Sequence, residues 1–418
     1  MNTRFSIGTA SLCVLMGGMN FVATPAYAWT DDNPPGASQC ADAGINDAGS
    51  IIENCLVSNT PKAYLTVAGA RSSVQLAPLP STPGGVPCSA DGISNAAAGS
   101  EIVIGACADA NNVSQAVAWQ ASSPGTAIQL QPIGGLLGLG ADVSAAASAV
   151  NQNGYIIGES VNVNGVATPV VWMPGSNTPT PLPVLPLLAT NQNCVPASIN
   201  DAQSPSIIGN CPGASGKNQA VLWPSAITLI PTLLPVPPGA SYCSASGINT
   251  GGKIFGQCVY GTATYRVVQW GAGGTGPTVL MTVDSLPALR TTGADQNDSG
   301  IIAVNYLAGG AQAGFKMPAR WDPSTGTNAP SIALPSNGNH GSVGAIGDNG
   351  RMFGNYETTD GYTHPFHVEA ASLTATDEGS PEGGRNAALT AISKNGRQEA
   401  GAGEDGTEHT RGMHQSLP

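Results

Sequence analysis

A single pattern of about fifty residues recurs eight times along this chain of 418 residues. Each copy is anchored on one position, in most copies an Ile or Val, that precedes Asn or a similar residue. Successive anchors lie 48, 57, 49, 49, 48, 50 and 46 residues apart. The anchors are Ile45, Ile93, Val150, Ile199, Ile248, Gln296, Ile346 and Ile392. Repeats of this period indicate an array whose units bury their apolar faces against their neighbours.

Each unit has the pattern of three or four short strands. A turn rich in Asn, Asp and Gly follows the anchor, which is typical of a hairpin. The second strand holds a Gly at one place in six copies, which predicts a bulge or a closely approaching backbone: Gly105, Gly158, Gly209, Gly256, Gly354 and Gly401. The third strand ends in Trp in five copies, for which we expect core packing rather than carbohydrate stacking: Trp119, Trp172, Trp223, Trp270 and Trp321.

These units predict an all-β fold. No window has the 3.6-residue period of an amphipathic helix, and the Pro-rich fourth strand is suited to a sheet edge. Short antiparallel strands repeated in this way favour a β-propeller of eight blades, with three to four strands each. Seven blades are the alternative, and a β-solenoid is a weaker one because its coils are shorter. Residues 29–418 would form one domain, and the segment 29–38 could add the edge strand missing from the last unit.

Residues 1–28 have the pattern of a secretory signal peptide. Arg4 precedes an apolar run that extends to Val22, and residues 26–28 offer an A-x-A cleavage site. Glycines interrupt the run, and no later run of 18 apolar residues follows, so we expect no membrane span. Cys13 lacks the small preceding residues of a lipoprotein signal. We therefore expect a protein exported to the periplasm or beyond the cell.

The cysteines occupy two fixed places in the repeat. Four units have a Cys at both places, and the other four units have a Cys at neither place. This both-or-neither pattern predicts a disulfide inside each of the four units, and it agrees with an oxidising compartment. Zinc binding is a weaker alternative because the chain has no C-x-x-C motif. The predicted pairs are Cys40–Cys55, Cys88–Cys107, Cys194–Cys211 and Cys243–Cys258.

The charge balance limits the partners. The chain has 14 Lys and Arg against 26 Asp and Glu, a formal net charge of −12. Nucleic acids and anionic membranes are bound through basic surfaces, which this chain lacks. We expect a monomer with a protein or glycan ligand, and no nucleic-acid partner.

The repeat resembles the HAF repeat of bacterial extracellular proteins. The resemblance rests on an Asn turn, an "IIG" strand, a strand of the form A-V-x-W and a Leu-rich tail, and it covers nearly the whole of residues 29–418. The His-Ala-Phe triplet that defines the family is degenerate here, with His364-Pro365-Phe366 as its nearest form. The resemblance implies a secreted, propeller-like module, and it implies no particular chemistry.

Two groups of residues are candidates for chemistry. Asp295, Asn297 and Ser299 are spaced like the start of a calcium loop, although Tyr306 occupies the place of its final acidic ligand. Turn formation is the simpler interpretation. The five His all lie in the last 79 residues, where loops of the last two units could bring four side chains together: Asp360, His364, Glu408 and His409.

Known hydrolase motifs are missing from the sequence. It has no G-x-S-x-G and no H-E-x-x-H, and "GASGKN" at 213–218 lacks the first Gly and the Ser or Thr of a P-loop. We expect no cofactor and no metal. A binding module that acts through variable blade loops is the first hypothesis. The alternative is an exported enzyme that acts on a polysaccharide or another polymer with acids and His of the last two units.

Overall fold

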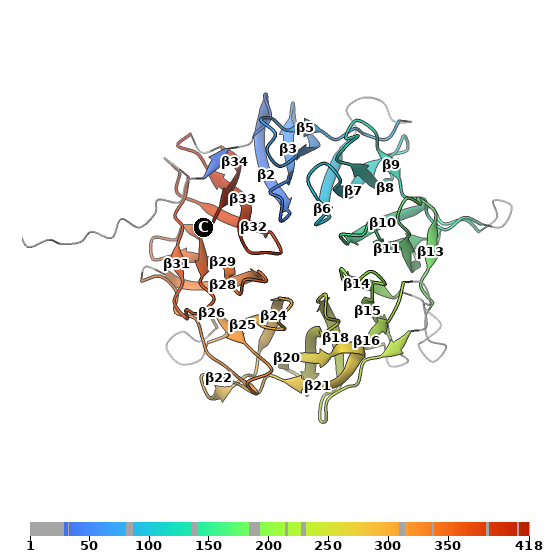
Figure 1. Cartoon of the computed structure of the whole chain (residues 1–418). Coiled ribbons are helices and arrows are strands. Elements are labelled where there is room, and N and C mark those ends of the chain that lie inside the picture. The colour runs from blue at the N-terminus through green and yellow to red at the C-terminus, as the bar shows by residue number, and fades with distance from the viewer. Residues whose placement is uncertain are drawn as a thin grey trace, which may run out of the picture.

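The computed structural model describes most of the chain after residue 28. The described residues are 29–31, 33–80, 87–135, 140–183, 193–213, 216–226, 231–308, 314–336, 338–381, 384–407 and 409–417. Their regular elements are all β-strands except for one 3₁₀ turn, η1 (Ala272–Gly274). Small sheets stand around a central axis (Figure 1), so the prediction of an all-β propeller is confirmed. The predicted signal peptide lies outside the described residues.

Each repeat supplies one antiparallel sheet, and we number these sheets as blades in chain order. Blade one is built from β2 (Ala37–Ile45), β3 (Ile51–Val57), β4 (Thr60–Thr66) and β5 (Val74–Gln75). Blade two is built from β6 (Cys88–Ile93), β7 (Ile102–Ala108), β8 (Ser114–Gln120) and β9 (Ile128–Gln129). Blade three is built from β10 (Ser144–Val150), β11 (Ile156–Val161), β12 (Ala167–Trp172) and β13 (Pro179–Pro181). Blade four is built from β14 (Val195–Ile199), β15 (Ile207–Pro212), β16 (Asn218–Trp223) and β17 (Thr232–Leu233).

The second half of the ring is less regular. Blade five is built from β18 (Tyr242–Ile248), β19 (Ile254–Tyr260), β20 (Thr264–Gly271) and β21 (Thr275–Val279). Blade six is built from β24 (Thr291–Gln296), β25 (Ile302–Leu307) and β26 (Lys316–Trp321). Blade seven is built from β28 (Gly338–Ile346), β29 (Met352–Thr358), β30 (Thr363–Val368) and β31 (Thr376–Asp377). A small extra sheet beside blade six is built from β22 (Thr282–Val283), β23 (Leu286–Pro287) and β27 (Asn328–Ala329).

Blade eight joins the two ends of the described chain. It consists of β32 (Ala387–Ile392), β33 (Gln398–Glu404) and β34 (Thr410–Ser416), with β1 (Thr30–Asp31) on its outer edge. Thr30 of β1 pairs with His414 of β34. The expectation that residues near 29–38 supply an edge strand is confirmed. Because β1 covers β34, the pairing closes the ring with strands that are far apart in sequence.

The repeated Gly of the second strand lies where another backbone comes close. A Cβ on Gly105 would lie 2.0 Å from the carbonyl oxygen of Ser89, and one on Gly256 would lie 2.0 Å from that of Ser244. The first strand slips by one residue at the same place, for example between Ala245 and Gly247. The bulge and the close approach are therefore one feature, and any side chain here would collide with the first strand.

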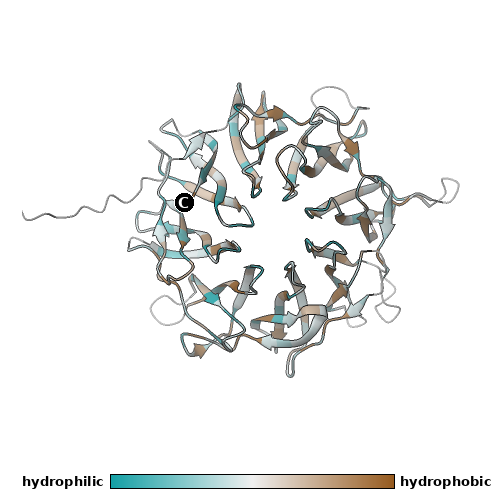
Figure 2. Ribbon diagram, viewed as in Figure 1, coloured by the Kyte–Doolittle hydropathy of each residue, from teal (hydrophilic) through white to brown (hydrophobic). Residues whose placement is uncertain are grey.

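Apolar residues lie along the strands of every blade (Figure 2), and the buried ones form clusters that join neighbouring blades. The five Trp side chains are fully buried. The indole of Trp119 donates to the carbonyl of Ala77 in the preceding blade, and that of Trp270 donates to Pro235. The interpretation of the Trp series as core packing is confirmed.

All four predicted disulfides are present and no cross-blade pair occurs among the described cysteines. Three bonds join the first two strands of their own blade, the fourth joins Cys194, which directly precedes β14, to Cys211 of β15, and the Cα atoms are 4.1–4.2 Å apart in all four. Cys243 lies directly opposite Cys258, as Cys40 lies opposite Cys55. The bonds therefore fasten hairpins in blades one, two, four and five.

Reduction of the disulfides should therefore destabilise some blades more than others. Each disulfide closes a loop of 15–19 residues, for which the chain-entropy model gives about 3 kcal/mol. We expect amide hydrogen exchange under reducing conditions to rise most in blades one, two, four and five. Blades three, six, seven and eight serve as the internal control, and an equal rise in all blades would contradict this assignment.

Candidate functional site

The turns between first and second strands meet at the centre of the ring. In five of them the residue after the anchor is an Asn whose side-chain amide donates to the backbone carbonyl of the equivalent turn in the next blade, at 3.0–3.3 Å. We call these residues the asparagine belt: Asn46, Asn151, Asn200, Asn249 and Asn297. Ser94 takes this place in blade two. The belt links neighbouring blades around the central channel.

Each belt residue also shapes its own turn. The side-chain oxygen of Asn249 accepts the backbone N–H of Lys253 at 2.9 Å, and that of Asn297 accepts the N–H of Ile301 at 3.0 Å. Both side chains are at most 5% exposed. One amide thus satisfies buried backbone groups of two blades, which no apolar residue in this place can do.

A second set of hydrogen bonds lies next to the belt. Asp201, Asp298 and Asp348 each accept a backbone N–H from the preceding blade at 2.8–2.9 Å. Asp47 accepts the N–H of Asn395 at 2.6 Å and so joins blade eight to blade one. These carboxylates have structural partners, although they also surround a polar hollow.

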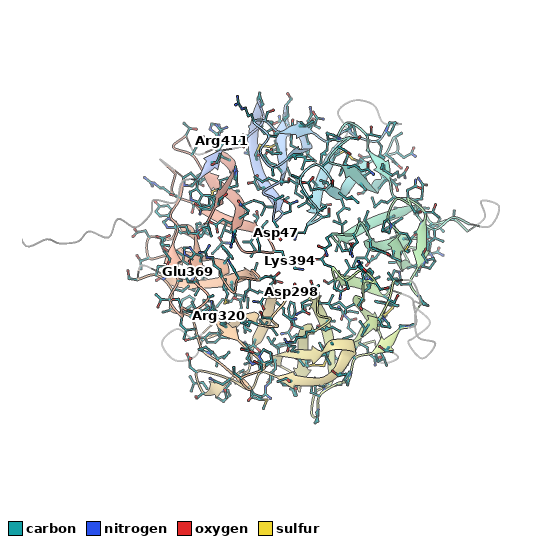
Figure 3. All side chains as sticks on the ribbon, viewed as in Figure 1. Asp47, Asp298, Arg320, Glu369, Lys394 and Arg411 are labelled. Atoms are coloured by element: carbon teal, nitrogen blue, oxygen red, sulfur yellow. A yellow bond between two sulfur atoms is a disulfide. The ribbon has the colours of Figure 1, made fainter. Side chains whose placement is uncertain are left out.

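Lys394 reaches across this hollow from blade eight. Its ammonium group lies 2.8 Å from Asp201 and 3.4 Å from Asp298, and it donates to the hydroxyl of Thr250 at 2.6 Å. Figure 3 places Asp47, Lys394 and Asp298 at the centre of the ring. Burial alone would lower the pKa of Lys394, but Asp201, Asp298 and Asp348 together raise that pKa above its usual value. Lys394 is therefore charged and ties blade eight to the opposite side of the channel.

The hollow at the channel mouth has a volume of about 390 Å³ and an acidic lining. Asp295 also lines it, and burial raises the pKa of this carboxyl to about 6. Backbone N–H groups of Gln296 and Ile346 donate to the same carboxyl. The polar groups of the mouth are thus engaged with one another, and they hold the ring together.

A buried titratable group lies between blades seven and eight. Nδ1 of His367 lies 2.6 Å from Glu378, and Glu399 is hydrogen-bonded to Glu378 and to Gln415. All four residues are at most 6% exposed. Glu399 and Gln415 pair at the place where Ile254 and Trp270 pair in blade five. The group therefore replaces an apolar contact in the core.

Burial changes the protonation of this group. Burial, and next the charge of Glu378, raises the pKa of Glu399 to about 9, while burial raises that of Glu378 to about 7. Burial lowers the pKa of His367. Shifted pKa values are frequent in active sites, but structural networks shift them too. No substrate can reach this group, because its side chains are closed to solvent.

The described members of the group of two acids and two His predicted for the last two units do not contact one another. His364 lies 3.1 Å from Asp377 within blade seven, and His409 bonds to Thr407 in the turn before β34. Asp360 is exposed in the turn before β30. Glu408 lies outside the described residues. Among the described members, no hydrogen bond or ion pair joins one to another.

The proposed calcium loop is a belt turn. Asp295 receives backbone N–H groups, and Asn297 is a member of the asparagine belt. The backbone carbonyl of Ser299 accepts a hydrogen bond from Lys253 at 3.0 Å. The arrangement thus gives each of these residues a role in joining blades five, six and seven.

Two adjoining hollows are lined by residues of blades five and six and of the segment around β22. β22 lies at the outer rim of the ring (Figure 1). The apolar hollow, of about 450 Å³, is lined by Val283, Leu286, Pro287, Ala288 and Leu289. The basic hollow, of about 410 Å³, is lined by Gln257, Tyr265, Asn305 and Lys316. Arg290, Tyr306 and Leu307 border both hollows. Volumes of this size suit a small ligand or a few residues of a peptide.

Sequence reasoning missed these hollows, which we call together the rim site. Their lining comes from the segment 283–290 and from residues of β19, β20, β24, β25 and β26, which lie apart in the sequence. One signal was present: no Asp or Glu occurs between Asp201 and Asp284. In a chain with a net charge of −12, such a stretch marks an unusual surface.

The comparisons with known proteins support the fold alone. Neither a family model nor a curated protein sequence matches the chain. A puromycin-hydrolysing peptidase of Mycobacterium tuberculosis has a TM-score of 0.50 at 11% identity, and the match covers 85% of this chain and 56% of that chain. A structure from a study of two prolyl endopeptidases has a TM-score of 0.53 at 11% identity, with coverages of 88% and 54%. The chain thus spans about half the length of these peptidases.

The third comparison is with a propeller domain by itself. The β-propeller domain of the Trilobed protease from Pyrococcus furiosus has a TM-score of 0.50 at 8% identity, and the match covers 79% of this chain and 95% of that chain. These similarities define the class of fold as a β-propeller. In the part of the chain that is described, no helix is long and apolar enough to cross a membrane.

The asparagine belt makes a prediction about stability. Asn249→Ala removes a buried amide that bonds to its own turn and to blade six. We expect a loss of about 2–3 kcal/mol in the free energy of unfolding, since buried backbone groups lose their partners. Asn162→Ala is the matched control, because Asn162 bonds only to its own turn between β11 and β12. Equal losses in urea unfolding of the two variants would contradict the inter-blade role.

The buried carboxyls make a prediction about pH. Their pKa values of about 7 and 9 lie above the value of about 4.3 for an unfolded Glu. Between about pH 5 and 9 the folded chain therefore holds more protons than the unfolded chain, and stability falls as pH rises, by at most about 1.4 kcal/mol per pH unit for each retained proton.

Glu399→Gln should flatten this dependence. The measurement is the unfolding midpoint from pH 5 to 9, with Asp360→Asn as a control at an exposed carboxyl. If the unfolding midpoint of Glu399→Gln changes with pH as steeply as that of the unaltered chain, Glu399 does not hold the extra proton. A midpoint that falls more steeply with pH in Glu399→Gln than in the unaltered chain would also contradict the raised pKa of Glu399.

Proposed function

We propose that this protein is an exported binding module whose ligand site is the rim site of blades five and six. The observation that carries the proposal is an exposed apolar surface in a hollow. Leu286 is 68% exposed and Leu289 is 53% exposed, and both line the apolar hollow. A group of apolar side chains that borders a hollow and is exposed to solvent is typical of a binding surface.

The contrast with the channel mouth supports this choice. At the mouth, carboxylates and Lys394 bond to one another and to backbone groups. At the rim site, no hydrogen bond or ion pair of the described residues engages the side chains of Arg290 and Lys316. Unused polar groups beside exposed apolar groups are features of a site that awaits a ligand.

Export is part of the proposal. It rests on the signal-peptide pattern of residues 1–28 and on four disulfides, which persist in oxidising compartments. Membership of the HAF-repeat family, proposed from the repeat pattern, agrees with a secreted propeller-like module. The ligand classes that we expect are proteins and glycans.

The alternative function, an exported enzyme acting on a polymer, has weaker support. Among the described acids and His of blades seven and eight, Glu399 and His367 are closed to solvent, and His364 and His409 lie in separate contacts. Catalysis requires its groups within reach of one substrate atom. His364→Ala and Glu408→Gln test this alternative, since loss of turnover of a bound glycan without unfolding would support the enzyme.

A binding array with two matched variants tests the proposed function. The protein is applied to peptide and glycan arrays, and binding is compared with that of Leu286→Asp, which places a charge in the apolar hollow. Val163→Asp is the control, because Val163 is 75% exposed in a turn of blade three. We expect the bound signals to fall at least tenfold with Leu286→Asp only. Signals that persist in Leu286→Asp would contradict the proposal.

A further inference from the structure

The rim site has a defined order of side chains. Tyr265 is a bridge partner of Arg290, the N–H of Leu307 donates to the carbonyl of Arg290 at 3.2 Å, and Leu307 pairs with Lys316. All four residues line the basic hollow. Neighbouring strands lie about 5 Å apart, so Arg290 and Lys316 stand about 10 Å apart at the backbone, on either side of Leu307.

The two cations are free to bind an anion. Arg290 and Lys316 are exposed, and no described side chain forms an ion pair or hydrogen bond with them. Arg351 and Arg411, by contrast, form ion pairs within the chain, with Glu369 and Asp405. Long flexible side chains at this spacing can converge on one carboxylate, and Arg can bind it with two parallel hydrogen bonds.

The nearby acidic group does not cancel this charge. Asp284 lines the apolar hollow, where its carboxylate accepts the backbone N–H of Ser331 at 2.9 Å, and it supplies one negative charge against the two positive charges of Arg290 and Lys316. Arg266 adds positive charge beside the hollows, where it donates to the carbonyl of Ala288 at 3.2 Å. The local charge is therefore positive, although the whole chain is acidic.

From these observations we infer that the rim site binds a ligand with a terminal carboxylate next to an apolar chain. The carboxylate is held between Arg290 and Lys316, and the apolar chain enters the adjoining hollow past Leu307 toward Leu286. Two sources have this chemistry: the free C-terminus of a peptide that ends in an apolar residue, and a fatty acid. The inference rests on the proposed binding function and names its ligand class.

Titration calorimetry with defined probes tests the inference. The probes are the peptide Gly-Gly-Leu, its C-terminal amide, and octanoate, each added to the folded full chain. We expect the free acid to bind at least tenfold more tightly than the amide, since a charged hydrogen-bonded pair is lost in the amide. Added salt should weaken binding of the acid. Binding by octanoate alone would assign the fatty acid as the source, and binding by Gly-Gly-Leu alone would assign the peptide.

Variants locate the carboxylate. Arg290→Gln and Lys316→Gln should each weaken about tenfold the binding of whichever free acid binds, Gly-Gly-Leu or octanoate. The affinity for the peptide amide should stay unchanged. Arg71→Gln is the control, because it removes an exposed Arg of blade one. All three positions are on the surface, and circular dichroism checks the fold of each variant.

The outcomes separate this inference from the proposed function. If the acid and the amide bind equally, or if neither acid binds while array ligands still depend on Leu286, the carboxylate inference is wrong and the binding function stands. If Leu286→Asp leaves all array binding intact, the ligand does not bind at the rim site, and both the proposed function of this site and the carboxylate inference are wrong.

Discussion

The fold depends on how the blades are held to one another around a channel. Antiparallel sheets satisfy their own backbone groups, but the turns that meet at the centre leave buried carbonyl and N–H groups. The asparagine belt solves this problem with one residue type. Each amide accepts from its own turn and donates to the next, as Asn249 does with Lys253 and Asn297. Farther out, apolar contacts and indole hydrogen bonds continue the same junctions.

The groups that stabilise the ring and the groups proposed to bind a ligand lie in different parts of the molecule. Charged groups gather at the channel mouth, where Lys394 bonds to Asp201 of the opposite side and the groups are mutually satisfied. Between blades seven and eight, His367, Glu378 and Glu399 fill a place that apolar residues fill elsewhere. Neither group is free for a ligand. The rim of blades five and six differs, because a detour of the chain through β22 and β23 adds exposed apolar residues and an unused Arg290 there.

The repeat itself made much of this fold predictable. The offsets of the cysteines predicted four disulfide pairs, and the repeated Gly predicted a close backbone, because both are local consequences of one hairpin. The sequence pattern indicates only a turn for the Asn after each anchor, since the second partner of its side chain lies a whole repeat away, as Ser94 does from Asn46. The rim site could not be predicted, because Tyr265, Arg290 and Lys316 come from separate strands and only the fold brings them together. His364 and His409, grouped from the acid and His content of the last two units, lie in separate contacts for the same reason, because a high content of one residue type in a stretch of sequence does not place its members together in space.

Hydrogen exchange at single turn amides tests the central claim most directly. The amides of Lys253 and Ile301 donate to belt residues, whereas those of Asn164 and Val166 donate to Asn162 in a similar turn that lacks an inter-blade bond. Because belt turns open only when neighbouring blades separate, we expect Lys253 and Ile301 to exchange at least a hundredfold more slowly than Asn164 and Val166 (about 3 kcal/mol of extra protection). Equal exchange at the two kinds of turn would show that the belt does not hold the blades together.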